Sequence, residues 1–582
     1  KMDTQQITTR TERVDDIPLL LAQMHKIGLA SFIDKHFPTH GNWQGLSIGQ
    51  VTTGWLSYIL SSGDHCLNHV ESWAEQLLVT LSTRLEAEVR ALDFSDDRLA
   101  TLLDYLAQDE EWEDFECTLN SNILRVYNLK AERVRIDTTT AKSYVEVNED
   151  GLFQFGYSKD HRPDLPQLKI SPSALEPLGL PVTTTVVSGN RADDPLYIPE
   201  IKRVQTSLGI PGVLYIGDSK MGSLETRAYI AHTRDYYLCP LSALQVPQEE
   251  LERLLEPVWH QEQILSTVYR PRCQEEIDRG DTAEALAEGF AYEETLRAYV
   301  EGKEIEWREQ RLVVRSKKHA QRQQKALDTR LQQAQAEIAK LNVRGRKVLK
   351  GDELHSAVDK LLAKYRVEGM VTPSYHTETR TRHKRAYRNR PAQTIANSET
   401  TVYSEIDPLA YQHAVRCLGF RVYVSNDMRL SLNEAVLAYR EEYRIERGFG
   451  RYKGQVLGLT PLYLTGEDRI KGLIRLLSIG LRLLCLLEFG VRKALSERAE
   501  KLAGIYRGNP KRATANPTAE MMLKAFMWVS LTELELNGTK RRYLSVLSTV
   551  QKRILALLDL PVTIYWELTH EFVELGYEMS EP

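Results

Sequence analysis

The sequence lacks the cysteine spacing of disulfide-rich and zinc-finger proteins. Its 582 residues include six cysteines, and none of them belongs to a Cys-x-x-Cys pair. Neither a disulfide framework nor a structural zinc is therefore indicated, and a reducing cytoplasm is the expected setting. The hydrophobic content of 42% over this length predicts a globular protein of three or four domains.

A long uncharged hydrophobic run is also missing. The most apolar stretch, residues 473–487, contains Arg475 and Arg482, and the first residues show no apolar segment typical of a signal peptide. Charges inside the apolar stretch argue against a membrane span. Because the two arginines are seven residues apart, they share one stripe of a helix. The stretch therefore predicts a core helix with one polar edge.

An overall positive charge, which would favour DNA binding, is absent as well. The net charge is −5, but residues 1–130 hold 20 acidic and 10 basic residues, which leaves the rest net positive by about five. Residues 311–350 hold 12 basic residues against two acids, and residues 380–390 hold six and no acid. Such clusters suit a phosphate backbone. The candidate DNA-binding residues are Arg315, Lys317, Lys318, Arg322, Arg344, Arg346, Lys347, Arg380, Arg382, Lys384, Arg385, Arg388 and Arg390.

The spacing of apolar residues divides the chain into five regions. Apolar residues recur every three or four positions near the start, which predicts helices, whereas the next region alternates as strands do. A helix or short coiled coil is expected over residues 321–341. The expected regions are a helical N-terminal domain (1–130), the first part of an α/β core (131–242), an insertion with the basic segments (243–418), the second part of the core (419–470) and a helical C-terminal region (471–582).

The expected core consists of five strands in the order of a ribonuclease-H-like sheet. A short strand ends at Asp137, a hairpin follows over residues 144–158, and further strands cover 181–189, 212–217 and 235–242. Asp194 and Pro195 predict the start of a helix that continues through Val204. The expected fold is therefore α/β, with a mixed five-stranded ribonuclease-H-like sheet, flanking helices, a long insertion after the fifth strand, and helical N- and C-terminal regions.

Two aspartates stand at the ends of these strands. Asp137 and Asp218 each follow an apolar strand, and neighbouring strands would place their backbones within about 5 Å of each other. Carboxylates at one sheet edge suit Mg²⁺, and a pair of such ions can activate an attacking oxygen and stabilise a leaving one. One aspartate at a strand end is more often a turn or cap residue, so the prediction depends on a third acid.

The third acid is expected on a helix beyond the insertion. Ser431 and Glu434 fit a capping box that opens this helix. Tyr439, Glu446 and Lys453 follow at intervals of seven, which places them along one helical face. An acid between a phenol and an ammonium suits a metal and a phosphate together. A charged, solvated helix face is the alternative interpretation.

These residues resemble the signature of a transposase family. In DDE insertion-sequence transposases of the insertion-sequence-four superfamily the pattern is Y-x2-R-x3-E-x6-K. Tyr439, Glu446 and Lys453 match it, whereas Glu442 stands at the arginine position, so that Arg440 or Arg444 is the candidate replacement. The segments RIDTTT, GYSKDHRPDLPQ, VLYIGDSKM, GFRVYVSN and GIYRGNPKRATANPTAE are also similar to one branch of these transposases.

The resemblance implies roles for individual residues. Asp137, Asp218 and Glu446 would be the catalytic, metal-binding triad, holding two Mg²⁺ ions that Mn²⁺ could replace. Tyr439 and Lys453 would position phosphate. The segment SKDHRPD adds Lys159, His161 and Arg162 as candidate phosphate contacts at the edge of the site, and a salt-bridged turn is the alternative for this segment.

The implied reaction is hydrolysis at transposon ends, followed by attack of the freed 3′ hydroxyl on target DNA. The implied partners are double-stranded DNA and a second copy of the chain on that DNA, in a nucleoid-associated, cytoplasmic, bacterial setting without a membrane. Two alternatives remain open. One is a ribonuclease-H-like nuclease that cuts without joining, and the other is a transposase-derived DNA-binding protein without catalysis.

Overall fold

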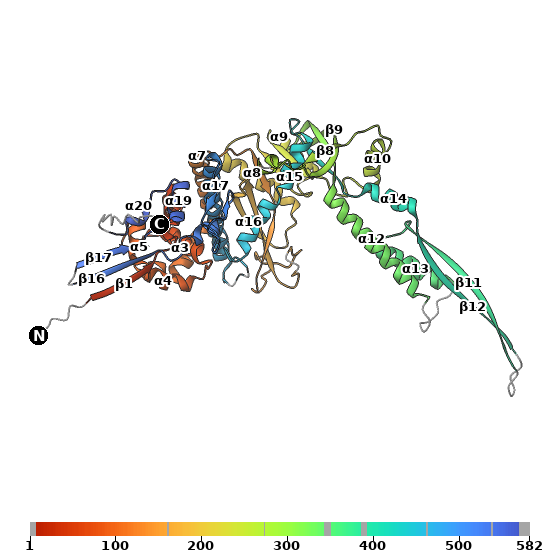
Figure 1. Ribbon diagram of the computed structural model, residues 1–582, viewed down its shortest axis with the longest axis horizontal. Helices are drawn as coiled ribbons and strands as arrows, with labels where there is room; N and C mark the ends of the chain where they lie inside the picture. Colours follow the sequence, from red (N-terminus) through yellow and green to blue (C-terminus); the bar gives the residue numbers. More distant parts are fainter. Residues whose placement is uncertain are drawn as a thin grey trace. The chain divides into compact units, whose positions relative to one another are not determined.

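The computed structural model describes residues 7–159, 162–272, 274–342, 351–385, 393–460, 462, 464–536 and 539–569. It divides into two compact units, and the colours of Figure 1 follow the chain through both. The first unit comprises Lys1–Leu238, Arg297–Ile305 and Arg440–Pro582, and the second comprises Cys239–Leu296 and Glu306–Tyr439. The first unit is therefore built from segments that precede and follow the second unit in the sequence.

A mixed sheet forms the centre of the first unit, which confirms the expected α/β architecture. Its strands are β2 (Arg133–Ile136), β3 (Thr139–Lys142), β4 (Gln167–Leu175), β5 (Leu180–Ser188), β6 (Leu214–Ile216) and β7 (Tyr236–Pro240). β4 pairs antiparallel with β5 along one edge and with β2 and β3 along the other. β2 runs parallel to β6, and β6 runs parallel to β7. The strand order is therefore β5-β4-β2-β6-β7, with β3 continuing the line of β2.

The strand that pairs with β2 does not come from residues 144–158, where a hairpin was expected. Among the described residues of that segment, Gln154 makes only an isolated bridge with Gln167. Phe153 is buried, but Phe155 and Tyr157 on the same alternation are 56% and 83% exposed, so the alternating residues share no continuous buried face. The partner of β2 is instead β4, in which Pro172 interrupts the apolar pattern that would have marked a strand.

Helices cover this sheet because its strands are buried along most of their length. α8 (Tyr197–Leu208) packs on β4 and β5, and α7 (Asp109–Tyr127) and α17 (Glu467–Glu497) pack on β5. α8 begins three residues after the expected cap at Asp194, because Asp194–Leu196 form a 3-10 turn. It continues past Val204 and ends at Gly209, whose positive φ of 64° suits a helix terminus.

The N-terminal region is helical after one strand. Trp55, Trp112 and Phe115 are among its fully buried side chains. Its elements are β1 (Ile7–Arg13), α1 (Ile17–Lys26), α2 (Leu29–His36), α3 (Ile48–Ser62), α4 (Leu67–Glu75), α5 (Leu78–Leu85), the 3-10 helix η1 (Ala91–Phe94), α6 (Asp96–Leu106) and α7 (Asp109–Tyr127). The segment after β6 adds α9 (Leu224–His232).

The C-terminal region is not wholly helical, contrary to expectation. β16 pairs with β1 from the other end of the chain and with β17, which gives the order β1-β16-β17. The sequence SLTELEL of β16 alternates with a period of two, which is the strand signal. The elements are α17 (Glu467–Glu497), β14 (Leu502–Ala503), β15 (Ala513–Thr514), α18 (Ala519–Lys524), β16 (Ser530–Leu536), β17 (Thr539–Leu544), α19 (Thr549–Leu557) and α20 (Thr563–Trp566).

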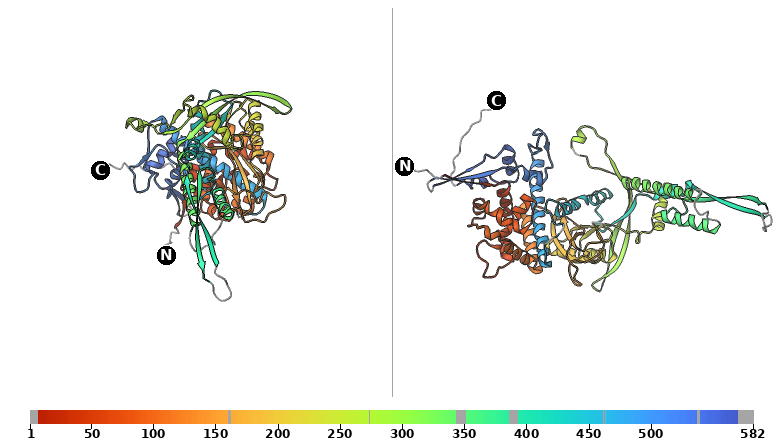
Figure 2. Two further views of the ribbon diagram at one scale, coloured as in Figure 1. Left: turned by 90° about the vertical axis from the view of Figure 1, so that its right-hand side faces the viewer. Right: turned by 90° about the horizontal axis from the view of Figure 1, so that it is seen from below.

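α17 is the long helix that Figure 2 shows crossing the first unit. It packs against α3, α6 and β5, and it contains both arginines of the apolar stretch. Arg482 is fully buried and donates to Glu116 (2.6 Å) and to the Pro181 carbonyl (3.0 Å). Arg475 donates to the Leu106 carbonyl (2.9 Å). The predicted core helix with one polar edge is confirmed, and no helix among the described residues is long and apolar enough to cross a membrane.

The second unit combines a sheet in the order β13-β10-β9-β8 with helices and a separate hairpin of β11 and β12. The hairpin extends beyond α12 and α13 (Figure 1). The elements are α10 (Gln248–Trp259), β8 (Ser266–Tyr269), α11 (Gln274–Asp278), β9 (Ala285–Val300), β10 (Lys303–Ser316), α12 (Lys317–Lys340), α13 (Asp352–Tyr365), β11 (Val371–Lys384), β12 (Gln393–Ile406), α14 (Pro408–Cys417), β13 (Phe420–Ser425) and α15 (Leu432–Arg440).

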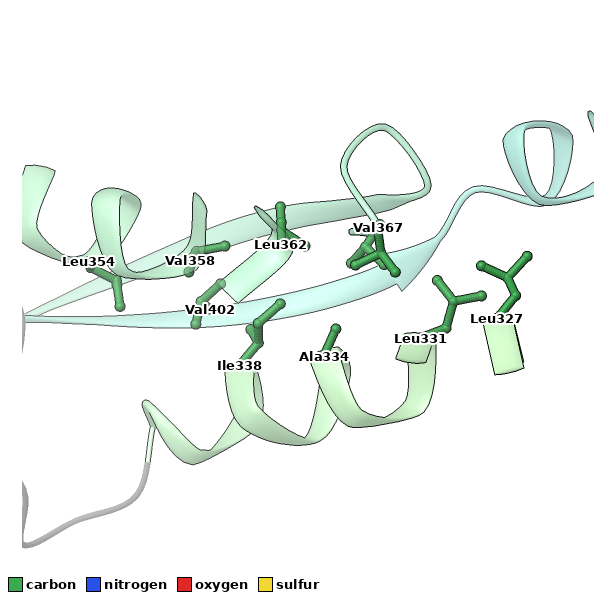
Figure 3. Packing of buried hydrophobic residues seen from close by; sticks show 10 residues of the cluster. Leu327, Leu331, Ala334, Ile338, Leu354, Val358, Leu362, Val367 and Val402 are labelled. Atoms are coloured by element: carbon green, nitrogen blue, oxygen red, sulfur yellow. The ribbon is translucent and has the colours of Figure 1, made fainter. Parts of the chain in front are cut away.

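The predicted helix near residues 321–341 is α12, and its apolar stripe is buried within the unit. Leu327, Leu331, Ala334 and Ile338 face α13 and the hairpin strand β12 in one hydrophobic cluster (Figure 3). Their spacing of four, three and four places them on one helical face. α12 is thus part of a mixed helix and strand core and not of a coiled coil.

Candidate active site

Asp137 and Asp218 meet at one edge of the sheet in the first unit. The last residue pair of the parallel β2–β6 ladder is Arg135 with Ile216. Each aspartate lies two residues further along its own chain, so the same register places Asp137 opposite Asp218. The two charges interact, because Asp218 raises the pKa of Asp137. The structure therefore brings together the two acids that the sequence singled out.

Asp137 lies at a break between two strands and is mostly buried. β2 ends at Ile136 and β3 begins at Thr139, so this short interruption of the ladder positions the carboxylate. Its Oδ1 accepts from the Thr138 amide (2.7 Å) and from Lys159 Nζ (3.3 Å). Burial is the largest cause of the raised pKa of Asp137, and the Lys159 charge counteracts it. Lys159 therefore lies beside Asp137.

Asp218 is held by groups that the sequence did not identify. Its Oδ1 accepts from the Tyr197 hydroxyl (2.7 Å) and from the Lys220 amide (2.9 Å). Burial and then the Asp218 charge raise the pKa of Tyr197 well above its usual value, so the phenol stays protonated and donates. Because Tyr197 is the first residue of α8, the start of this helix fixes the orientation of the Asp218 carboxylate.

An ion-pair network borders the same edge of the sheet. Asp193 accepts from Lys169 Nζ (2.6 Å) on β4 and from Lys220 Nζ (3.2 Å). Burial acts to raise the pKa of Asp193, but the two lysines outweigh it and the pKa is lowered. The sequence signal for this network was weak, since a lysine within a strand is usually solvent-exposed.

α16 (Tyr443–Lys453) brings the third acidic segment to this sheet. Lys453 Nζ donates to the Thr140 carbonyl on β3 (3.0 Å). Ile445 and Tyr452 are buried on the side of the helix that packs against α17 and the sheet. Glu446 is exposed, and it lies seven residues before Lys453 on the same helical stripe.

Glu442 interacts electrostatically with all three members of the expected triad. It is half-buried, and burial is the largest cause of its raised pKa. The charge of Arg135 counteracts this increase. Asp137, Glu446 and Asp218 each raise the pKa of Glu442 further. The four carboxylates therefore belong to one negatively charged region, in which the charges of the other three disfavour the ionised form of Glu442.

The helix that was expected to carry Tyr439, Glu446 and Lys453 on one continuous face is interrupted. α15 ends at Arg440, Glu441 and Glu442 form a turn, and α16 begins at Tyr443. The capping box at the start of α15 is confirmed, because Ser431 and Glu434 bond each other's backbone amides (3.0 and 3.2 Å). Tyr439 belongs to the second unit, where its ring contacts that of Tyr423 at 4.8 Å.

The two candidates for the missing arginine differ in their surroundings. Arg440 is exposed at the end of α15. Arg444 donates to the Pro177 carbonyl and to Glu441 Oε1 (3.2 Å), so its guanidinium is engaged in holding the start of α16. Arg162 forms a bidentate pair with Asp164 (2.7 and 2.8 Å), which is the salt-bridged-turn alternative for that residue.

The basic segments of the second unit divide into structural and exposed residues. Arg315 donates to the Leu418 carbonyl (3.1 Å) and pairs with Glu288 (3.2 Å), so it has a structural role. Exposed basic side chains occur on the first two turns of α12 and near the tip of the hairpin: Lys317, Lys318, Arg322, Arg382 and Arg385. Arg380 and Lys384 belong to β11. The predictions at His161, Arg344, Arg346, Lys347, Arg388 and Arg390 lie outside the described residues.

Comparison with known families identifies the chain. Residues 173–483, more than half of its length, match the family model described as Transposase DDE domain. The chain belongs to this family. Residues 9–116 of the transposase match a second model, described as Domain of unknown function (DUF4277). No curated protein matches it. A cryo-EM structure of the piggyBac transposase synaptic complex with hairpin DNA is similar at 8% identity and a TM-score of 0.35, over 88% of this chain and 79% of that one. A likeness this weak carries no argument about fold or function.

The donor set of the transposase suits divalent cations, which DDE domains generally use. Asp137, Asp218, Glu442 and Glu446 offer only oxygen ligands, which hard cations such as Mg²⁺ prefer. Burial, followed by the charges of neighbouring carboxylates, raises the pKa of Asp137 and of Glu442, and a bound cation would favour their ionised forms. Among the described residues, no three of these carboxylates have ligand atoms within 4.8 Å of one another.

Proposed function

We propose that this transposase cuts DNA at the ends of its transposon and joins the freed ends to target DNA. The observation that carries the proposal is the register that places Asp137 opposite Asp218. We assign Asp137, Asp218 and Glu446 as ligands of two Mg²⁺ ions, with Mn²⁺ as a possible replacement and Glu442 as an additional carboxylate of the site. When bound, such ions activate an attacking oxygen and stabilise the leaving oxygen of an in-line displacement.

The neighbouring residues orient the ligands and hold phosphate. The Tyr197 hydroxyl donates to Asp218 Oδ1, which would leave Oδ2 of that carboxylate as the metal ligand. The charge of Lys159 counteracts the burial that raises the pKa of Asp137. Lys159 contacts Thr138 just before β3, and Lys453 contacts Thr140 within β3, so these two lysines would bind the scissile phosphate. Water attacks in the first step and the freed 3′ hydroxyl in the second, so no protein nucleophile is required.

DNA contacts outside the site are assigned to the exposed basic residues of the second unit. Lys317 and Lys318 begin α12, where positive charge opposes the helix dipole and weakens the helix. Binding of these lysines to DNA phosphate would offset this loss of helix stability. Two transposon ends must be cut together, which implies a homodimer on DNA.

The test uses a plasmid that carries the natural element with its flanking DNA. We expect purified protein to nick at the element boundaries only when Mg²⁺ or Mn²⁺ is added. The variant Asp218→Asn should bind the same DNA without nicking it. Metal-dependent nicking that persists in Asp218→Asn at the wild-type rate contradicts the residue assignment.

Two other functions remain as outcomes of the same experiment. With pre-cut ends and a target plasmid, nicking without strand joining would identify a nuclease. DNA binding without nicking under any metal condition would identify a transposase-derived DNA-binding protein. The register that places Asp137 opposite Asp218, and the interaction of Glu442 with both, support the catalytic transposase over this last alternative.

A further inference from the structure

A group of side chains able to bind a metal lies in the second unit, whereas the carboxylates described above belong to the first. We propose that Glu252, His413 and Cys417 bind a zinc-type divalent ion that joins α10 to α14. The proposal concerns a structural site and does not depend on the proposed function.

Two neighbouring helices supply the three ligands. His413 and Cys417 are four residues apart on α14, so both side chains project from one face of that helix. Glu252 comes from α10, which packs against α14. The ligand atoms of the three side chains all lie within 4.8 Å of one another. Zinc bonds of about 2.0 to 2.3 Å would need only small side-chain rotations to form.

The three side chains converge without satisfying one another. His413 Nε2 and Glu252 Oε2 are 3.9 Å apart, which is too long for a hydrogen bond. The other oxygen of Glu252, Oε1, accepts from Gln248 Nε2 (2.8 Å), and this bond holds the carboxylate toward α14. The Trp259 ring contacts the His413 ring at 5.4 Å, which restricts the orientation of the imidazole. These supporting contacts resemble the outer partners that orient metal ligands.

A second group of potential ligands, Asp64, Cys66 and His69, shows the contrast. There the Asp64 carboxylate is already satisfied, because it accepts from Tyr58 (2.5 Å) and from the Cys66 amide (2.9 Å) and contacts His69 Nδ1 at 2.8 Å. These hydrogen bonds account for the close approach of the three side chains without a metal. In the Glu252 group, Gln248 hydrogen-bonds both Glu252 and Cys417, but Glu252 and His413 stay 3.9 Å apart. The sulfur, nitrogen and oxygen atoms of this group form a set that zinc accepts with one position left for water.

The consequence of metal binding would be a stabilised second unit. Glu252 and His413 are 161 residues apart in the sequence, so a metal link between them closes a long loop. Burial is the main cause of the raised pKa of the Cys417 thiol, and the Glu252 charge raises it further. Metal binding must therefore displace a proton from sulfur, and affinity should weaken as the pH falls.

The test titrates full-length protein with Co²⁺ after treatment with a chelator, under a reductant that contains no thiol. We expect a thiolate-to-cobalt charge-transfer absorption at one equivalent of sulfur-bound metal. His413→Gln and Cys417→Ser should each lose this absorption. His413 is half exposed, so its replacement should preserve the fold, which circular dichroism can check. Zn²⁺ should raise the Tm of the wild-type protein and leave that of His413→Gln unchanged.

Matched variants identify the site. Cys66→Ser removes the thiol of the other ligand group, and Asp218→Asn alters the carboxylate site; both should keep the absorption. The proposal is overturned if the wild-type protein gives no thiolate absorption. It is equally overturned if Cys66→Ser loses the absorption or if folded His413→Gln retains it.

Discussion

Asp137 lies opposite Asp218 across the two parallel strands β2 and β6. Lys159 compensates the charge of Asp137, and a phenol and a backbone amide bind Asp218. The raised pKa of Asp137 follows from burial and from the charge of Asp218. The site is thus prepared for cations at a cost in stability of the metal-free protein.

Asp137→Asn should abolish catalysis while stabilising the metal-free protein. Loss of a metal ligand should reduce DNA cleavage on the order of a thousandfold, since bound metals contribute several kcal/mol to the transition state. The pKa of Asp137 is raised in the folded state, so its ionisation lowers stability as the pH rises through that pKa. Without metal at neutral pH, Asp137→Asn should therefore have a higher Tm than wild type, measured by calorimetry. Asp150→Asn, at an exposed position, should change neither quantity.

Glu446→Gln and Glu442→Gln should have different effects. We expect Glu446→Gln to eliminate cleavage with DNA binding intact, because it removes a metal ligand. Glu442→Gln should be milder and should retain reduced cleavage, because this residue mainly contributes charge. Single-turnover cleavage and gel-shift binding measure the two properties. If Glu442→Gln loses cleavage and Glu446→Gln retains it, Glu442 is the third ligand and our assignment is wrong.

Arg482→Met should destabilise the fold strongly. Arg482 is fully buried and paired with the buried Glu116. Removing one partner of such a pair leaves an uncompensated charge and typically costs about 3 to 5 kcal/mol. Arg469→Met on the same helix is the control, because its pair with Asp104 is exposed and should contribute less than about 1 kcal/mol. Urea unfolding measures both, and equal losses would contradict the buried-pair argument.

Asp16 should give the N-terminal region a distinct pH dependence. Burial raises the pKa of Asp16 to about 7, although Ser61 donates to its carboxylate. The unfolded chain ionises this group near pH 4, so stability should fall as the pH rises from about 4 to 7, by a few kcal/mol in order of magnitude. Asp16→Asn should flatten the stability profile in this window. The exposed Asp97→Asn should leave the profile as in wild type.

Sequence patterns predicted those parts of the site that depend on residues close together in the sequence. The strands before Asp137 and Asp218 are short apolar runs, and the Ser431–Glu434 capping box is a contact across three residues. β4 was missed because Pro172 breaks its pattern and only the pairing with β2, β3 and β5 makes it a strand. Strand pairing between distant segments cannot be read from periodicity.

The break between α15 and α16 was missed for a related reason. Glu441, Glu442 and Tyr443 are compatible with a continuous helix by intrinsic preference. The turn brings Glu442 near Asp137 and Asp218, and this placement depends on contacts with a sheet that lies more than 200 residues earlier. Similarly, Tyr197 and Lys169 became visible as site residues only through their contacts.

The two-part construction of the first unit has a consequence for biosynthesis. Asp137 and Asp218 are translated before the second unit, whereas Glu442 and Glu446 are translated after it. A nascent chain that stops within the second unit carries Asp137 and Asp218 but neither Glu442 nor Glu446. Under the proposed assignment, prematurely terminated products lack the third metal ligand, and the ribosome must complete the long intervening segment before all ligands of the site exist.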